Sequence, residues 1–236
     1  MSEILKYVTF SFDDGVTQDK RLVALLNKYG LKGTFNLNSS LFGLKGGWEQ
    51  NGKFLSHNKV MPNDVKELYA EHEVAVHTLT HPNLTTEEEE TIIYQVEEDR
   101  KRLSNMVGYD VYGMAYPCGG VNNDERVASI IKEKTGVRYS RTITSTYSFE
   151  LPKNAYRLDP TVGVYEPKNV FLLADEFLSM KPNSPQLFYI WGHSYEFDVT
   201  DEMSWERFEE LCALISGKED IFYGTNKEVL GRLKLI

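Results

Sequence analysis

The sequence contains only two cysteines, Cys118 and Cys212, and no long hydrophobic run. The cysteines do not have the spacing of a disulfide framework, which excludes a small disulfide-stabilised scaffold. No window approaches the roughly 18 consecutive apolar residues that a membrane-spanning helix needs. We therefore expect a chain that folds around a hydrophobic core and does not span a membrane.

Positive charge is also scarce. Lysine and arginine number 26 against 35 aspartates and glutamates, which gives a formal net charge of -9. Proteins that bind nucleic acid or anionic membrane surfaces need clustered cations, so neither partner is expected. An uncharged sugar or a metal cation is compatible with this charge. The first ten residues, MSEILKYVTF, lack the basic start, apolar stretch and cleavage site of a secretion signal, which predicts a cytoplasmic protein.

What the sequence does contain is an alternation of short apolar strands with longer helical segments, without an internal repeat or a linker. Its 236 residues fit a single domain, 1–236, since single (β/α) barrels reach about 200–250 residues. The alternation predicts an α/β fold with a parallel sheet, closed or partly closed into a (β/α) barrel. The expected strands are 7–12, 33–38, 73–77, 113–116, 137–140, 187–191 and 221–223, with a hairpin turning at Asn51-Gly52; the expected helices are 22–29, 62–70, a long one capped by Thr85 or Thr86, 124–133, 169–180 and 204–215.

Residues 7–15, YVTFSFDDG, are the stretch around which the predicted site is organised. Apolar residues alternate with threonine and serine, which is the pattern of a half-buried strand. The strand ends in two adjacent carboxylates, Asp13 and Asp14, followed by Gly15. Such an ending costs desolvation and like-charge repulsion, which a metal ion or a proton transfer would use. Asp-Asp-Gly is also a common turn sequence, so this stretch alone leaves both interpretations open.

Polar candidates follow three further predicted strands. His77 and His81 come at the end of one, Cys118 lies in the turn after the next, and His193 follows the apolar run LFYIW. The carboxyl ends of parallel barrel strands share one face, and active sites are built there. Together with the carboxylate pair, these residues predict a functional site on that face.

A metal site is predicted from His77, His81 and Asp14. Two histidines four residues apart can place both imidazoles on one side of a tight loop. With a carboxylate they form a ligand set that suits zinc or another divalent ion and leaves positions open for water and substrate. His57 and His72 have no comparable context, and we interpret both as surface or structural residues.

The other carboxylate and the last histidine then acquire separate roles. One carboxylate of the pair can bind metal, while the other stays free to take a proton from a water activated by the metal. His193, on a separate strand, can supply a proton to the leaving group.

Four short motifs resemble those of the polysaccharide deacetylases, carbohydrate esterase family 4, which share the nodulation-type chitooligosaccharide deacetylase homology domain. Residues 11–15 (SFDDG) resemble the T-F-D-D-G motif, and residues 77–81 (HTLTH) match H-[ST]-x-x-H. AYPCG at 115–119 and WGH at 191–193 fall where the family carries R-x-P-[YF]-G and L-x-H. The motifs occur in the family's order and span most of the chain.

The resemblance implies a distorted (β/α)7-8 barrel and metal-dependent removal of acetyl groups from N-acetylated, sometimes O-acetylated, sugars. By motif position, Asp13 would be the general base, His193 the general acid, and Asp14, His77 and His81 the metal ligands. The cofactor would be a divalent metal, first of all Zn²⁺, with Co²⁺, Ni²⁺ or Mn²⁺ as alternatives.

The resemblance also implies contacts to the substrate. The backbone N–H of Cys118 would help stabilise the tetrahedral oxyanion. Tyr116, Trp191 and Tyr195 can offer flat apolar faces to a sugar, although such clusters more often belong to a core.

Three positions depart from the family pattern. Ala115 stands where members usually hold the base with an arginine, and we hypothesise that Arg141 reaches in from the next strand, with Arg138 as the other choice. Asp159 lies in the region of the aspartate that tunes the acid, but nothing around it matches that motif. Trp191 replaces the leucine that usually borders the acetyl methyl group.

Two other functions are compatible with the sequence. The same metal and mechanism could act on a non-sugar amide such as a cyclic imide or ureide. A metal-holding carbohydrate-binding protein that has lost catalysis is the second alternative. Retention of both Asp13 and His193 argues against it, because pure binding needs neither proton carrier.

Overall fold

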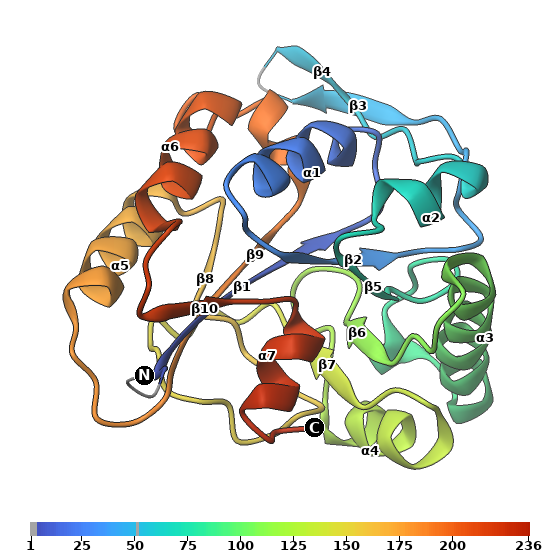
Figure 1. Cartoon of the computed structure of the whole chain (residues 1–236). Helices are drawn as coiled ribbons and strands as arrows, with labels where there is room; N and C mark the ends of the chain where they lie inside the picture. The colour runs from blue at the N-terminus through green and yellow to red at the C-terminus, as the bar shows by residue number, and fades with distance from the viewer. Residues whose placement is uncertain (1–3, 51) are drawn as a thin grey trace.

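A curled, parallel sheet forms the centre of the computed structural model, which describes residues 4–50 and 52–236 (Figure 1). The strands run in the order β7-β6-β5-β2-β1-β9-β8, and β10 also pairs with β1. Their bounds are β1 (Lys6–Asp13), β2 (Gly33–Leu37), β5 (Glu73–Val76), β6 (Gly113–Ala115), β7 (Tyr139–Arg141), β8 (Val162–Gly163), β9 (Gln186–Gly192) and β10 (Ile221–Tyr223). The predicted distorted (β/α)7-8 barrel is confirmed.

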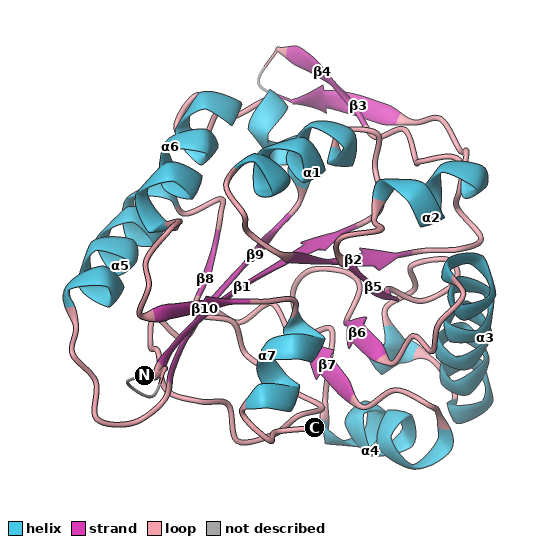
Figure 2. Ribbon diagram, in the orientation of Figure 1, coloured by secondary structure: helices cyan, strands magenta, loops and turns pink. Residues whose placement is uncertain are grey.

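Helices surround the sheet, and a separate hairpin lies at one end of the molecule, above α1 in the view of Figure 2. The hairpin strands are antiparallel, as predicted, and the turn residue Asn51 lies outside the described residues. The bounds are α1 (Asp19–Lys28), α2 (Val65–Leu68), α3 (Glu89–Val107), α4 (Glu125–Lys134), α5 (Pro167–Ser179), α6 (Trp205–Ile215) and α7 (Asn226–Arg232), with β3 (Gly47–Gln50) and β4 (Lys53–Ser56) in the hairpin.

One extended segment brings the two ends of the sheet together. Leu158 forms a parallel bridge with Arg141 at the end of β7, and four residues later Val162 pairs with Ile190 of β9. The segment 158–163 therefore contacts β7 through Leu158 and β9 through β8. This makes the sheet a distorted barrel with an interior, into which side chains of several strands point.

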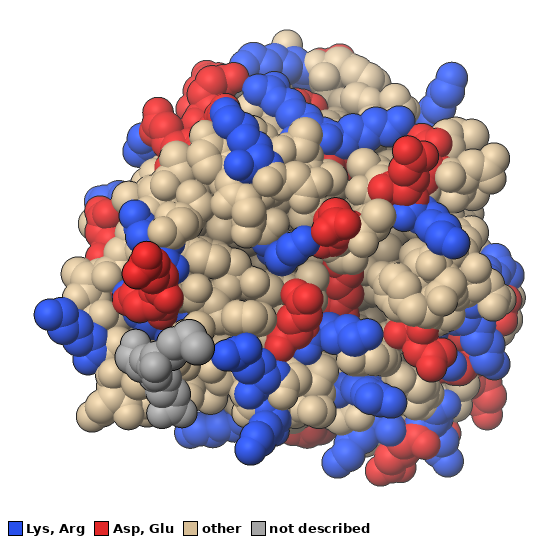
Figure 3. All heavy atoms as spheres, viewed as in Figure 1, with Lys and Arg blue, Asp and Glu red and all other residues tan. Residues whose placement is uncertain are grey.

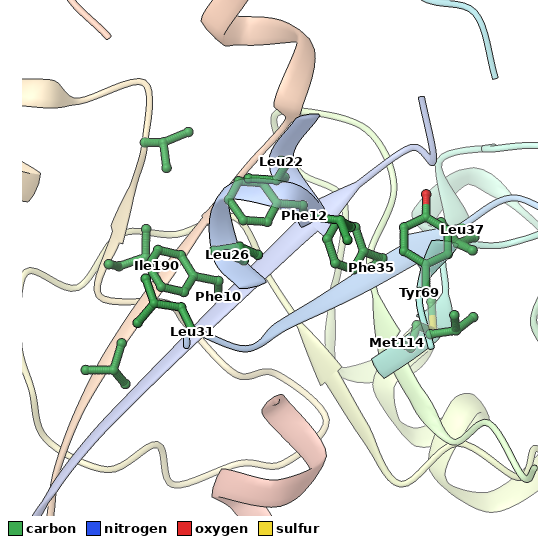
Figure 4. Close-up of a cluster of buried hydrophobic side chains, with 14 of the residues drawn as sticks. Phe10, Phe12, Leu22, Leu26, Leu31, Phe35, Leu37, Tyr69, Met114 and Ile190 are labelled. Carbon is green, nitrogen blue, oxygen red and sulfur yellow. The ribbon is translucent and has the colours of Figure 1, made fainter. Parts of the chain in front are cut away.

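The alternation along β1 separates a core from the barrel interior. Phe10 and Phe12 are fully buried, and both lie edge-on to Phe208 of α6, at ring-centre distances of 6.1 and 6.0 Å. Figure 4 shows these rings beside leucines of α1. Successive side chains of a strand point to opposite faces, so Ser11 and Asp13 are directed into the barrel. Asp13 thus arrives at the site from the inner face of the central strand.

The long helix begins later than predicted. Thr85 and Thr86 lie in a short 3₁₀ turn, and α3 starts only at Glu89. The Asn83 side chain accepts a hydrogen bond from the Thr85 backbone N–H (3.1 Å), so the asparagine, and not either threonine, caps the first turn. The prediction of Thr85 or Thr86 as the helix cap was wrong, because both lie in the 3₁₀ turn and Glu88, which makes no side-chain capping bond, precedes α3.

Charged side chains of both signs are interspersed on the face in Figure 3. None of the helices in the described part of the chain combines the length and the hydrophobicity that a membrane crossing requires.

Candidate active site

Asp13 lies at the end of β1 and is only 2% exposed. Its Oδ1 accepts a hydrogen bond from Asn36 Nδ2 on β2 (2.8 Å), and its Oδ2 accepts one from the Arg141 guanidinium of β7. Arg141 is itself fully buried and also donates from Nε to Ser11 Oγ (3.2 Å). Burial raises the pKa of Asp13, but the charges of Arg141 and His77 outweigh it and lower that pKa below its usual value. The carboxylate is therefore fixed in place and ionised at neutral pH.

Of the two arginines considered from the sequence, Arg141 reaches Asp13 and Arg138 does not. Arg138 is exposed, and its guanidinium carbon lies 4.7 Å from the centre of the Tyr112 ring. Strand residues two apart share a face, so Arg141 points inward with Tyr139, whereas position 138 is on the other side. Arg141, which pairs in register with Ala115, thus contacts Asp13 from the neighbouring strand.

Asp14 meets two imidazoles at the same end of the sheet. Its Oδ1 lies 3.6 Å from His81 Nε2 and 4.0 Å from His77 Nε2. One ligand atom from each of these three residues lies within 4.8 Å of the others. The hydrogen bond between His77 Nδ1 and the Ala115 carbonyl (2.9 Å) requires the proton on Nδ1, since a carbonyl only accepts. Nε2 of His77 is therefore free to act as a ligand.

The three donors fit a divalent metal. Burial lowers the pKa of His77 to about 4 and also lowers the pKa of His81, so both imidazoles are neutral near pH 7. Burial opposes the ionisation of Asp14, but a hydrogen bond from His57 and the nearby charges of His193 and Lys59 hold its pKa well below the usual range. Two neutral imidazoles and one carboxylate form a set that zinc accepts.

Strained turns carry several of these residues. Asp14 has a φ of 83°, His81 of 64° and Cys118 of 70°, in the left-handed region that non-glycine residues seldom adopt. Each such conformation costs on the order of 1–3 kcal/mol and persists only where its surroundings fix it. Thr78 and Gly15 beside them also have positive φ values. The strain is concentrated where the functional side chains converge.

His193 follows β9 and lies against a carboxylate that the sequence interpretation missed. Glu196 Oε2 accepts a hydrogen bond from the His193 backbone N–H (2.9 Å), and its Oε1 is 3.4 Å from His193 Nδ1. Burial alone would lower the pKa of His193, but Glu196, Asp14 and Asp13 raise it to about 9. The Tyr195 ring stacks on this imidazole at 4.8 Å.

Asp159 does not take part in this arrangement. It accepts a hydrogen bond from the Thr142 hydroxyl and lines a different surface pocket. The carboxylate beside His193 comes instead from Glu196, three residues further along the same loop. In the sequence, only its position three residues after His193 could have indicated that Glu196 contacts this histidine.

His57, interpreted from the sequence as a surface or structural residue, lies against the carboxylate of Asp14. Its Nε2 lies 3.1 Å from Asp14 Oδ2, and Lys59 Nζ donates to the Asp14 carbonyl (2.7 Å). Both follow the hairpin, whose turn brings them back over β1. His72, by contrast, is structural as predicted, because its Nδ1 accepts a hydrogen bond from the Gly33 N–H (3.1 Å).

A cavity of about 230 Å³ collects the predicted residues. Cys118, Tyr116 and Trp191 line it, but Tyr116 is fully buried and Trp191 is 5% exposed. The Arg141 guanidinium also lies 4.4 Å from the centre of the Trp191 ring. Neither aromatic ring therefore offers an open face to a sugar, and that part of the prediction was wrong. The cavity is lined by Asp13, Asp14, His77, His81, Tyr116, Cys118, Gly119, Ile143, Trp191, His193 and Tyr195.

A second cavity of about 420 Å³ adjoins the first beneath the hairpin. Asp14, His81 and Tyr195 line both cavities. Trp48 of β3, which is 42% exposed, and Lys45 line the second cavity but not the first. The space around Asp14 thus continues from the first cavity toward the hairpin.

Comparison with known proteins gives one sequence family. The sequence model described as polysaccharide deacetylase matches residues 3–139, which is more than half of the chain. No curated protein matches the sequence.

Solved structures of carbohydrate esterase family 4 share the fold at low sequence identity. A family 4 carbohydrate esterase from Streptomyces lividans in complex with acetate is 14% identical over 94% of this chain and 93% of its own, with a TM-score of 0.57. A variant of the peptidoglycan deacetylase PdaC from Bacillus subtilis is 14% identical over 100% of this chain and 95% of its own (TM-score 0.57). A mutant of BA3943, described as a pseudoenzyme of the family with restored enzymatic activity, is 17% identical over 97% of this chain and 69% of its own (TM-score 0.59).

Proposed function

The chain belongs to the polysaccharide deacetylase family, and from this premise we propose that it is a metal-dependent hydrolase that removes N- or O-linked acetyl groups from a carbohydrate. One observation carries the proposal. An ionised Asp13, a positively charged His193 and the donor set of Asp14, His77 and His81 all line one cavity of about 230 Å³. Metal-assisted hydrolysis of an amide or an unactivated ester uses a metal, a base and an acid at one carbonyl group.

The metal function would be supplied by Asp14, His77 and His81. A divalent cation held by these residues would polarise the acyl carbonyl and lower the pKa of a water molecule. Zn²⁺ suits two imidazoles and a carboxylate best, while Co²⁺, Ni²⁺ and Mn²⁺ are alternatives.

Asp13 would accept the proton of the attacking water. Its fixed position favours this role, since Asn36 on β2 and Arg141 on β7 each donate a hydrogen bond to one of its two oxygens. The same contacts keep it ionised and ready to act as a base. Arg141 would be a positioning residue that substitutes for the arginine usual at position 115.

His193 would protonate the departing amine or alkoxide. The carboxylate of Glu196, 3.4 Å from its Nδ1, favours the protonated imidazole, so the Nε2 proton is available for transfer. The backbone N–H of Cys118, which has no acceptor within the described residues, is the candidate donor to the oxyanion. A base and an acid that are both held in their reactive ionisation states favour catalysis over simple binding.

The substrate is proposed to be an acetylated saccharide, with the acyl group in the first cavity and the rest of the molecule directed to the second. Acetate release from N-acetylglucosamine oligomers and from acetylated xylan, combined with elemental analysis of the purified protein, tests this. Bound metal with acetate released supports the proposal. Bound metal without acetate from any glycan refutes it and favours the non-sugar amide, which a panel of cyclic imides and ureides would then reveal.

A further inference from the structure

The segment 57–60, which follows the hairpin, lies directly against the turn that carries Asp14. Lys59 forms an antiparallel bridge with Val16, and the Val60 N–H donates to the Gly15 carbonyl (2.9 Å). The Thr17 N–H donates to the Asn58 carbonyl (2.8 Å) on the other side of this bridge. These backbone contacts hold the turn in which Asp14 has its unfavourable φ of 83°.

The two oxygens of the Asp14 carboxylate have different partners. Oδ2 lies 3.1 Å from His57 Nε2, and because a carboxylate only accepts, the proton of this bond is on the imidazole. Oδ1 faces the other way, toward the Nε2 atoms of His81 and His77. The carboxylate therefore presents one oxygen to the ligand cluster and has the other occupied by a donor.

His57 is itself held on two sides by aromatic rings. Its ring centre is 5.4 Å from that of Trp48 and 5.1 Å from that of Tyr195. Its side chain is 22% exposed. The imidazole is therefore already held in place before a ligand binds, and its N–H already points at Asp14.

Lys59 places a positive charge beside the same carboxylate, and this charge opposes the binding of a cation. Its ammonium donates to the Asp14 carbonyl (2.7 Å) and lies 3.3 Å from Oδ1, the oxygen that faces the imidazoles. The side chain is 6% exposed, so water screens this charge only weakly. A divalent cation bound at Oδ1 would lie close to this ammonium and be repelled by it.

We propose that His57 and Lys59 set the metal affinity of the site in opposite directions. The His57 N–H orients Asp14 as a ligand through one oxygen, which strengthens binding, whereas the Lys59 ammonium weakens binding and compensates the charge of Asp14 when no metal is present. This inference rests on the proposed metal site, and it assigns to the hairpin segment a role that none of the family-like motifs carries. Hydrogen-bond partners of metal ligands typically change metal affinity by 10–100-fold when replaced.

The test measures the affinity of metal-free protein for Zn²⁺ by competition with a chromophoric chelator. His57→Phe keeps a ring between Trp48 and Tyr195 but removes the N–H, and we expect 10–100-fold weaker binding. His57→Gln, whose amide can reach the same oxygen, should recover most of the affinity. Lys59→Met should bind Zn²⁺ more tightly, on the order of tenfold. Lys53→Met on the preceding strand β4, which removes an exposed pair with Asp201, is the matched control and should leave the affinity unchanged.

Circular dichroism and thermal unfolding of each metal-free variant establish that it is folded, and Lys59→Met should unfold at a lower temperature than the wild type. Binding by His57→Phe within twofold of the wild type, or weakening by both substitutions, would overturn the inference. If His57→Phe does not fold, His57→Ala, which also removes the N–H, and Lys59→Met still decide it, because the first should weaken Zn²⁺ binding and the second should strengthen it. Absence of Zn²⁺ binding by the wild-type protein would instead refute the proposed metal site itself.

Discussion

Replacing Arg141 with methionine would leave the ionised Asp13 buried without its cationic partner. The guanidinium donates one bond to this carboxylate and further bonds to Ser11 Oγ (3.2 Å) and the Thr142 carbonyl (2.8 Å). All three bonds are donated by a charged guanidinium, and bonds that involve a charged group contribute about 1.5–3 kcal/mol each, so at the lower end of that range they give about 4.5 kcal/mol. Removal of one partner of a buried pair costs about 3–5 kcal/mol by an independent measure. We therefore expect the free energy of unfolding to fall by about 4 kcal/mol.

Urea denaturation at pH 7 measures this loss, and Arg138→Met is the matched control. Arg138 is exposed and contacts only the Tyr112 ring in a cation–π arrangement, so its replacement should cost at most about 1 kcal/mol. The double variant Asp13→Asn with Arg141→Met should recover part of the loss, because it removes the unpaired charge. A cost below about 1 kcal/mol for Arg141→Met would refute the reasoning that Arg141 holds the base.

The same substitution should change the acid dependence of stability. The folded-state pKa of Asp13 is lowered, so its contribution is present above the unfolded pKa of about 3.8 and is lost as pH falls through the folded pKa. Without Arg141 the burial of Asp13 raises its folded-state pKa above the unfolded value, and the sign reverses: the variant should lose stability relative to the wild type as pH rises above about 3.8, and the difference between the two should shrink at lower pH. Unfolding curves of the variant and the wild type between pH 3 and pH 7, a range chosen around the usual carboxyl pKa of about 4, would show this shift.

Three further predictions concern residues around the site. Glu196→Gln should slow release of acetate from an N-acetylated sugar by about 10²-fold or more, but hardly affect p-nitrophenyl acetate, whose leaving group needs no acid; equal loss on both substrates would contradict its action through His193. Burial raises the pKa of Asp19 to about 7, so the folded protein keeps a proton that the unfolded chain releases above about pH 3.8. The free energy of unfolding of Asp19→Asn should therefore rise relative to the wild type by up to about 4 kcal/mol between pH 4 and pH 8. A pH-independent difference in urea denaturation would contradict this. Trp191→Leu should open the acyl end of the cavity and raise activity on propionyl relative to acetyl esters, and an unchanged ratio of kcat/KM would count against Trp191 as its boundary.

Local patterns in the sequence predicted the parts of the site that single strands and turns encode. The alternation before Asp13 predicted the inner and outer faces of β1, and the spacing of His77 and His81 predicted two neighbouring imidazoles. The hypothesis that Arg141 reaches Asp13 agrees with the contact, and Arg141 lies beside Ala115 in the register of the next strand.

Residues whose role depends on long-range packing escaped the sequence analysis. His57 approaches Asp14 only because the hairpin turns back over β1, and nothing in its own neighbours signals this. Asp99 is a fully buried carboxylate within α3 that accepts hydrogen bonds from the N–H groups of Ser39 (2.8 Å) and His77 (3.3 Å). A helical heptad pattern marks such a position as buried but does not reveal which loop it faces.

In the proposed mechanism Asp13 carries the proton and Asp14 the metal, and Asp13→Asn separates these two roles. The variant and the wild type would be compared for Zn²⁺ content and for acetate release from N-acetylglucosamine oligomers in one preparation. We predict that Asp13→Asn keeps its metal and loses acetate release by about 10²–10⁴-fold, the usual contribution of a general base. A variant that retains full activity, or that loses its metal as His77→Ala should, would contradict the division of labour between the two carboxylates.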